Sequence, residues 1–136
     1  MKLTKIGLWG AALVGMSLVA CSKGGGGGTT NEAALVVTTN PANGSTQAAA
    51  PGPDFTLTVD ITSTMPPGGV TIAVTSAVDG SGATAFFSDN VSSSTADNSI
   101  QITGTPAQET CIVNITVTSK DKPTNTWSGS YLYSEK

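Results

Sequence analysis

Strict alternation of apolar and polar residues is the feature that most limits what this chain can fold into. Residues 55–61 read Phe-Thr-Leu-Thr-Val-Asp-Ile, and residues 111–117 read Cys-Ile-Val-Asn-Ile-Thr-Val. In an extended strand, every second side chain lies on the same face, so each run has one apolar face that can be buried. Threonine and valine, which favour strands, are abundant in the same stretches. The pattern therefore predicts β-strands that each cover a core with one face.

Turn-forming residues separate these runs and indicate how many strands the chain holds. Asn43-Gly44, Pro66-Pro67-Gly68-Gly69 and Asp79-Gly80 each stand between two apolar stretches. Further candidate strands cover residues 34–39, 70–74, 83–87, 100–103 and 127–133. No helical stretch is expected after residue 32. About seven short strands predict an all-β fold, an immunoglobulin-like β-sandwich over residues 33–136, with a small barrel as the structural alternative.

The C-terminal third of the chain carries a resemblance that supports this fold. The segment Ile102-Thr-Gly-Thr-Pro106, followed by the alternating residues 111–119, resembles the end of the Ig-like and cadherin-like domains of bacterial surface proteins. Those domains show an Ile-Ser/Thr-Gly-Thr-Pro turn, then an alternating strand and a last strand; Cys111 stands here near the usual aromatic position. The resemblance implies a sandwich but no activity, because such modules serve as spacers, adhesion units and binders.

The first 20 residues have the three parts of a secretory signal. Lys2 and Lys5 give a positive start, residues 6–20 are apolar, and small residues precede Cys21. A helix that spans a bilayer needs about 20 apolar residues, so this run is short for a membrane span. We therefore expect residues 1–20 to form a signal peptide that is removed on export, with an uncleaved anchor helix as the alternative.

The sequence Leu18-Val19-Ala20-Cys21 resembles a bacterial lipobox, in which a large apolar, a variable and a small residue precede a cysteine. The resemblance implies cleavage between Ala20 and Cys21, a diacylglycerol on the cysteine sulfur, and a fatty acyl chain such as palmitate on the new amino group. A thiolate is nucleophilic enough to accept the lipid. Each buried methylene contributes about 0.8 kcal/mol, so two or three chains anchor a protein stably. We therefore expect a lipoprotein attached through Cys21.

Five consecutive glycines, residues 24–28, follow the predicted lipid site. Residues 21–32 have no apolar pattern, and a Gly-rich chain of this length spans roughly 17–20 Å. A phosphate-binding glycine loop would need a preceding strand, a following helix and a Lys-Ser or Lys-Thr pair, which this stretch lacks. Residues 21–32 are therefore expected to be a lipidated cysteine and a flexible linker that holds the domain off the lipid surface.

Composition excludes several classes of function. The chain has no histidine and no arginine, and residues 21–136 carry four lysines against nine carboxylates, a formal charge of −5. Nucleic-acid binding depends on clustered cations and is not expected. Without histidine, neither a hydrolytic triad nor a transition-metal site is expected, and we predict no enzyme activity and no cofactor.

Calcium takes oxygen ligands, which this chain has in abundance. The candidates lie in predicted loops: Asp79, Asp89, Asn90, Asp97 and Asn98. Their spacing matches no calcium-binding loop, so the preferred interpretation is that they are solvated turn residues.

Cys111 and the aromatics of the last predicted strand are the remaining candidates for chemistry. Cys111 shares a face with Val113 and Ile115, so a buried apolar role is favoured over a reactive thiol. Trp127, Tyr131 and Tyr133 share one face of their strand and could form a flat platform for a sugar ring if that face were exposed. A core role is favoured, because a domain with so few aromatics needs them inside.

These features together predict a lipid-anchored, non-catalytic Ig-like module of the cell envelope that serves protein interaction, adhesion or envelope assembly. The alternative is a carbohydrate-binding domain that uses Trp127, Tyr131 and Tyr133. Ser22 after the cysteine is compatible with sorting to the outer membrane, on either side of it. The expected partners are the membrane, through the lipid on Cys21, and an envelope protein or glycan.

Overall fold

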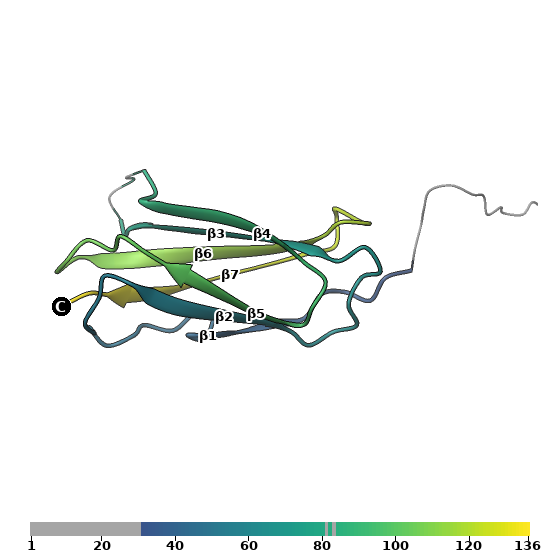
Figure 1. Cartoon of the computed structure of the whole chain (residues 1–136), viewed down its shortest axis with the longest axis horizontal. Helices are drawn as coiled ribbons and strands as arrows, with labels where there is room; N and C mark the ends of the chain where they lie inside the picture. Colours follow the sequence, from purple (N-terminus) through teal and green to yellow (C-terminus); the bar gives the residue numbers. More distant parts are fainter. Residues whose placement is uncertain (1–30, 81, 83) are drawn as a thin grey trace, which may run out of the picture.

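The computed structural model describes residues 31–136 except 81 and 83, and it shows two β-sheets packed face to face (Figure 1). The strands are β1 (Val37–Asn40), β2 (Phe55–Ile61), β3 (Val70–Val78), β4 (Phe87–Ser93), β5 (Asp97–Ile102), β6 (Thr110–Ser119) and β7 (Thr126–Ser134). One sheet has the order β1-β2-β5 and the other β4-β3-β6-β7. All neighbouring strands within a sheet are antiparallel. The predicted all-β sandwich of seven strands is confirmed.

Alternation along the strands builds the core between the sheets. In β2, the side chains of Leu57, Val59 and Ile61 point inward and are buried. The second sheet contributes buried residues at every second position of its two central strands: Val70, Ile72, Val74, Cys111, Val113, Ile115 and Val117. Full burial of one such side chain contributes about 1.5–3 kcal/mol, so these two strands supply much of the driving force for folding.

The fourth strand lies elsewhere than the sequence predicted. The expected strand at residues 83–87 is wrong for residues 84–86: β4 begins at Phe87 and continues through Ser93. It pairs only with β3, and most of its side chains are exposed. An edge strand that buries little carries no alternating signal, which is why periodicity does not reveal it. In immunoglobulin constant domains the fourth strand extends the sheet of the first two strands, whereas here it extends that of β3, β6 and β7.

The chain crosses from one sheet to the other directly after β1. The segment 45–50 runs parallel to β7, with bridges from Thr46 to Leu132 and from Ala50 to Glu135. Backbone hydrogen bonds of 2.8 Å from Gln47 N to Leu132 O and 2.9 Å from Leu132 N to Ser45 O hold it there. The peptide bond before Pro41, at the start of this crossing, is cis. The segment 45–50 therefore covers the outer edge of β7.

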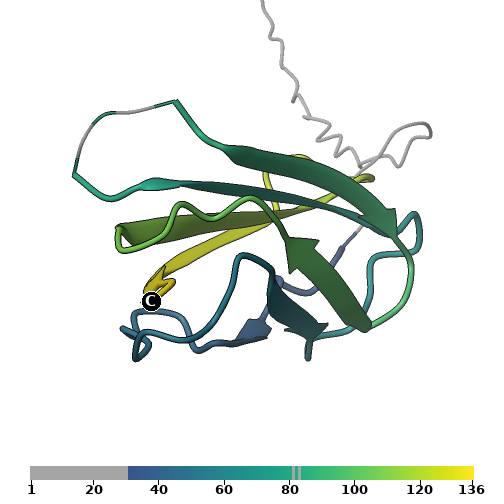
Figure 2. The same ribbon diagram turned by 60° about the vertical axis from the view of Figure 1, so that its left-hand side comes forward.

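The two ends of the sandwich are formed by different parts of the chain. The N-terminal end consists of residues 31–36 and the loops 62–69, 94–96 and 120–125. The C-terminal end carries the other three connections and the C-terminus, and Figures 1 and 2 both place it opposite residues 31–36. The predicted signal peptide, Cys21 and most of the predicted linker lie outside the described residues.

Candidate functional site

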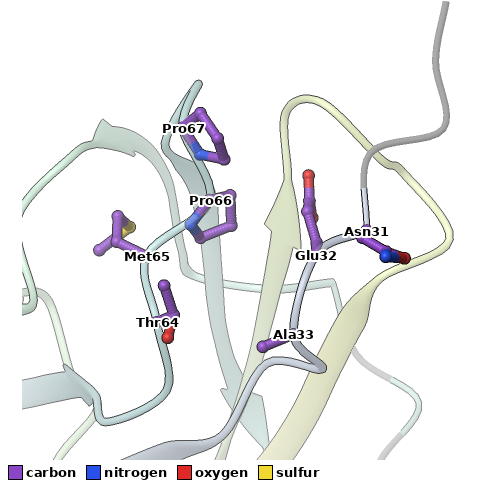
Figure 3. A pocket seen from close by; sticks show the side chains of 7 residues that line it. All are labelled: Asn31, Glu32, Ala33, Thr64, Met65, Pro66 and Pro67. Atoms are coloured by element: carbon purple, nitrogen blue, oxygen red, sulfur yellow. The ribbon is translucent and has the colours of Figure 1, made fainter.

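A pocket of about 410 Å³ lies at the N-terminal end, between residues 31–33 and residues 64–67. We call it the N-terminal pocket, and Figure 3 shows the two stretches facing each other across it. Its lining residues are Asn31, Glu32, Ala33, Thr64, Met65, Pro66 and Pro67. Because one wall is the first described stretch of the chain, the pocket borders the place where residues 1–30 join the domain.

Glu32, the one charged residue of this pocket, is bound to the loop between β6 and β7. Its two carboxylate oxygens accept hydrogen bonds from Ser119 Oγ at 2.9 Å and Asn125 Nδ2 at 3.0 Å. Asn125 also donates to the Ala33 carbonyl and accepts from the Leu35 amide, both at 3.0 Å. The carboxylate therefore fixes the N-terminal segment on the domain, and we call these contacts the Glu32 clasp.

The same loop is tied to the β2–β3 connection. The Asp121 carboxylate accepts a hydrogen bond from the Gly68 amide, and the Lys120 amide donates to the Gly69 carbonyl at 3.0 Å. Gly69 has a φ of +84°, and a Cβ at this position would collide with the Ser93 carbonyl. The β6–β7 loop thus joins the N-terminal segment to the β2–β3 loop and orders this end of the sandwich.

Replacing Asn125 with alanine tests the clasp. Asn125→Ala removes one of the two partners of the Glu32 carboxylate, and the side-chain partner of both the Ala33 carbonyl and the Leu35 amide. We therefore expect the free energy of unfolding to fall by about 1–3 kcal/mol. Urea unfolding of the full chain measures this. Thr124→Ala is the matched control, because Thr124 is exposed and should change stability by less than about 0.5 kcal/mol. Equal stability of the two variants would contradict the assigned role of the clasp.

A second pocket, of about 140 Å³, lies at the seam between the sheets. It is formed where the start of β2 faces β7, with the segment 41–50 as its remaining wall. We call it the seam pocket, and its lining residues are Pro41, Gln47, Ala48, Ala50, Phe55, Thr56, Tyr131 and Tyr133. Two of the three aromatic candidates from the sequence thus line one pocket.

The two tyrosines of the seam pocket have different hydrogen bonding. Both are 3% exposed, and their ring centroids lie 6.0 Å apart. The Tyr133 hydroxyl lies 2.8 Å from Thr105 Oγ1 and 3.1 Å from Ser76 Oγ, within hydrogen-bond distance of both. The Tyr131 hydroxyl has no hydrogen-bond partner among residues 31–136 as described. Burial raises the pKa of both phenols, so both are neutral at physiological pH.

Phenylalanine substitutions test whether the two hydroxyls contribute differently to stability. Tyr133→Phe leaves the buried hydroxyls of Ser76 and Thr105 without their partner, so we expect a loss of about 1–3 kcal/mol in the free energy of unfolding. Tyr131→Phe removes a hydroxyl that bonds to no described group and should cost less than about 0.5 kcal/mol. Urea unfolding of both variants checks the difference. A Tyr131→Phe loss as large as that of Tyr133→Phe would contradict this assignment.

Trp127 lies at the margin of the core. Its side chain is half-buried and packs against the core cluster, and a Cβ on Gly129 would collide with its indole. The sequence favoured a core role for Trp127, Tyr131 and Tyr133 over a flat exposed platform. The structure buries both tyrosines, so the three rings do not share an exposed surface.

The candidate calcium ligands lie on separate elements of both sheets. Asp79 is in the turn after β3, Asp89 and Asn90 are on β4, and Asp97 and Asn98 begin β5. Asn98 Nδ2 donates to the carbonyls of Thr95 at 3.0 Å and Ala96 at 3.1 Å, which makes Asn98 a turn residue. Within the described ranges, no three His, Cys, Asp or Glu side chains gather around a common point.

Cys111 faces the core, as expected from its place in the alternating pattern of its strand. Its side chain is fully buried and forms no disulfide. Burial, and to a lesser extent the charge of Glu109, raise the pKa of the thiol. The thiol is therefore protonated and enclosed, and it packs as a small apolar residue.

Sequence reasoning missed the Glu32 clasp and most of the seam pocket. Glu32 and Ser119 are 87 positions apart, and only the fold brings them together. The pocket wall at 41–50 lacks any periodic pattern. The alternation that begins at Phe55 did predict β2, which lines the seam pocket, but an alternating pattern does not indicate a cavity.

The described part of the chain contains no helix long and apolar enough to cross a membrane. Comparison with protein-family models gives no match, and no curated protein or solved structure matches the chain significantly.

Proposed function

We propose that this chain is a lipid-anchored, non-catalytic module of the cell envelope that holds a partner protein. The observation that carries the proposal is the lipobox-like Leu18-Val19-Ala20-Cys21 after an export signal, followed by a glycine run and one β-sandwich. Lipid on Cys21 attaches the chain to a membrane, and the glycines let the domain reorient there. Ser22 makes the outer membrane the proposed location.

The end at which the chain joins the sandwich supports this arrangement. Residues 31–36 lie at the N-terminal end, next to the loops 62–69 and 120–125, and the Glu32 clasp fixes them there. A tether attached at Asn31 pulls on this end. The C-terminal end, with the longest connection between described strands, residues 41–54, then lies away from the lipid surface and is free to meet a partner.

Two clusters of hydrogen-bonded polar side chains connect distant segments of the described residues. Glu32 is bound by Ser119 and Asn125, and the Tyr133 hydroxyl is bound by Ser76 and Thr105. Both groups are held by hydrogen bonds from neighbours on distant segments of the chain. This arrangement favours a binding or spacer role over catalysis.

Cross-linking in intact cells tests the proposal. The tagged full chain is cross-linked and captured, and the Cys21→Ser form serves as the control. We expect one dominant envelope protein that is captured with the anchored form and lost with the control. Capture of the same partner by both forms would show that binding does not need the anchor, and recovery of no protein partner would overturn the proposed function.

A further inference from the structure

The seam pocket has the size of a single six-membered ring. Its volume is about 140 Å³. An apolar protein cavity of about 150 Å³ accommodates one benzene molecule, whereas pockets for metabolites and drugs are usually about 300–1,000 Å³. The seam pocket is therefore too small for a whole metabolite and large enough for one side chain.

The walls select a neutral, flat occupant. Half of the lining residues carry rings, namely Phe55, Tyr131, Tyr133 and Pro41, and the others are Gln47, Ala48, Ala50 and Thr56. Phe55 and Tyr133 meet edge to face, with centroids 4.8 Å apart and planes at 69°. No charged side chain is among the lining residues. Aromatic walls of this kind favour another aromatic ring, which can adopt the same offset or edge-to-face contacts.

Two polar groups of the pocket are left without partners. Tyr131 is only 3% exposed, and its hydroxyl forms no hydrogen bond with a described residue. That hydroxyl reaches solvent, because Thr39 Oγ1 is the one enclosed side-chain polar atom without a partner in the described part of the chain. Gln47 uses its amide nitrogen to donate to Ser45 Oγ at 2.8 Å, which leaves its amide oxygen without a hydrogen bond in the described chain. A hydroxyl on the incoming ring could accept from Tyr131 and donate to Gln47, because a phenol does both.

We propose that the seam pocket binds the side chain of a tyrosine presented by a partner protein. The inference rests on the proposed partner-binding function and names the residue that the partner inserts. Aromatic residues seated in buried pockets are the usual energetic centres of protein interfaces. Here the pocket supplies aromatic packing for the ring and two free polar groups for its hydroxyl.

The test uses p-cresol, the side-chain analogue of tyrosine, and toluene, which lacks only the hydroxyl. The isotope-labelled full chain with Cys21→Ser is titrated with each, and chemical-shift changes are followed by NMR. We expect p-cresol to shift signals of Gln47, Ala48, Phe55 and Tyr131, with a dissociation constant of the order of 1 mM, as for a ligand of about eight heavy atoms. Signals of Ala33 and Thr64 at the N-terminal pocket should not move.

Two variants make the result specific. Ala48→Phe places a ring at the pocket and should abolish the shifts. Ala48 is exposed, and its amide donates no hydrogen bond to β7, so the substitution should leave the segment 45–50 in place. Tyr131→Phe should weaken p-cresol binding about five-fold, as expected for one hydrogen bond, and leave toluene binding unchanged. Their one-dimensional spectra report whether each variant is folded.

Three outcomes would overturn the proposal: no saturable shifts with p-cresol, equal shifts in the Ala48→Phe chain, or toluene bound as tightly as p-cresol. The last would show a pocket that recognises apolar rings without selecting tyrosine. The titration needs neither the lipid nor the partner. Its failure is therefore distinguishable from failure of the cross-linking experiment that tests the proposed function.

Discussion

Replacing Cys21 with serine is expected to abolish stable membrane attachment. A serine hydroxyl does not take the diacylglycerol that a thiolate accepts, so the chain loses the two or three acyl chains that would anchor it. We expect the Cys21→Ser protein in the soluble fraction, or as an unprocessed precursor that keeps residues 1–20. Fractionation of cells followed by immunoblotting measures both its location and its size.

The second cysteine supplies the matched control for this experiment. Cys111→Ala removes a buried thiol that forms no disulfide and should leave membrane attachment unchanged. If the Cys21→Ser chain fractionates with membranes at the size of the processed protein, lipid on Cys21 is not what anchors it.

Truncation of Ile72 is expected to have the largest effect on stability. Ile72 lies on β3, between β4 and β6, and its side chain is fully buried opposite Val91 and Val117. Ile72→Ala removes three carbon atoms and leaves a cavity between the sheets, so we expect a loss of about 3–4 kcal/mol in the free energy of unfolding. Urea unfolding of the full chain with Cys21→Ser gives the value.

Val36→Ala is the control for this truncation. Val36 is 53% exposed, and its replacement should change stability by less than about 0.5 kcal/mol. A loss below about 1 kcal/mol for Ile72→Ala would mean that the side chain is not enclosed between the sheets.

The sequence predicts the inner strands of this fold better than the outer ones. The alternation at 55–61 coincides with β2, and that at 111–117 lies wholly within β6, because in both strands one face is turned to the core and the residues on it are buried, apart from the partly buried Phe55. β4 reads Phe-Ser-Asp-Asn-Val-Ser-Ser and is mostly exposed, so its place in the sheet comes from pairing with β3 and not from its own pattern. β5 begins at Asp97, ahead of the predicted start at residue 100, for the same reason.

The candidate sites could be predicted only in part. Because Tyr131 and Tyr133 are two positions apart, the alternating pattern places them on one face of their strand. That face can be turned to the core or can form an exposed platform. Their burial depends on the segment 41–50, which crosses between the sheets and covers β7. The Glu32 clasp joins residues about 90 positions apart, and no local pattern reports such a contact. Sites built from distant segments depend on the order in which the strands pair, and the alternating pattern of a single strand does not reveal that order.

The lipid on Cys21 is the central claim, and the mass of the intact protein extracted from membranes tests it most directly. We expect a chain that begins at Cys21 and is heavier than its residues by one diacylglycerol group and one further acyl chain. A mass that still includes residues 1–20, or that of a processed chain with no added lipid, would contradict lipid attachment.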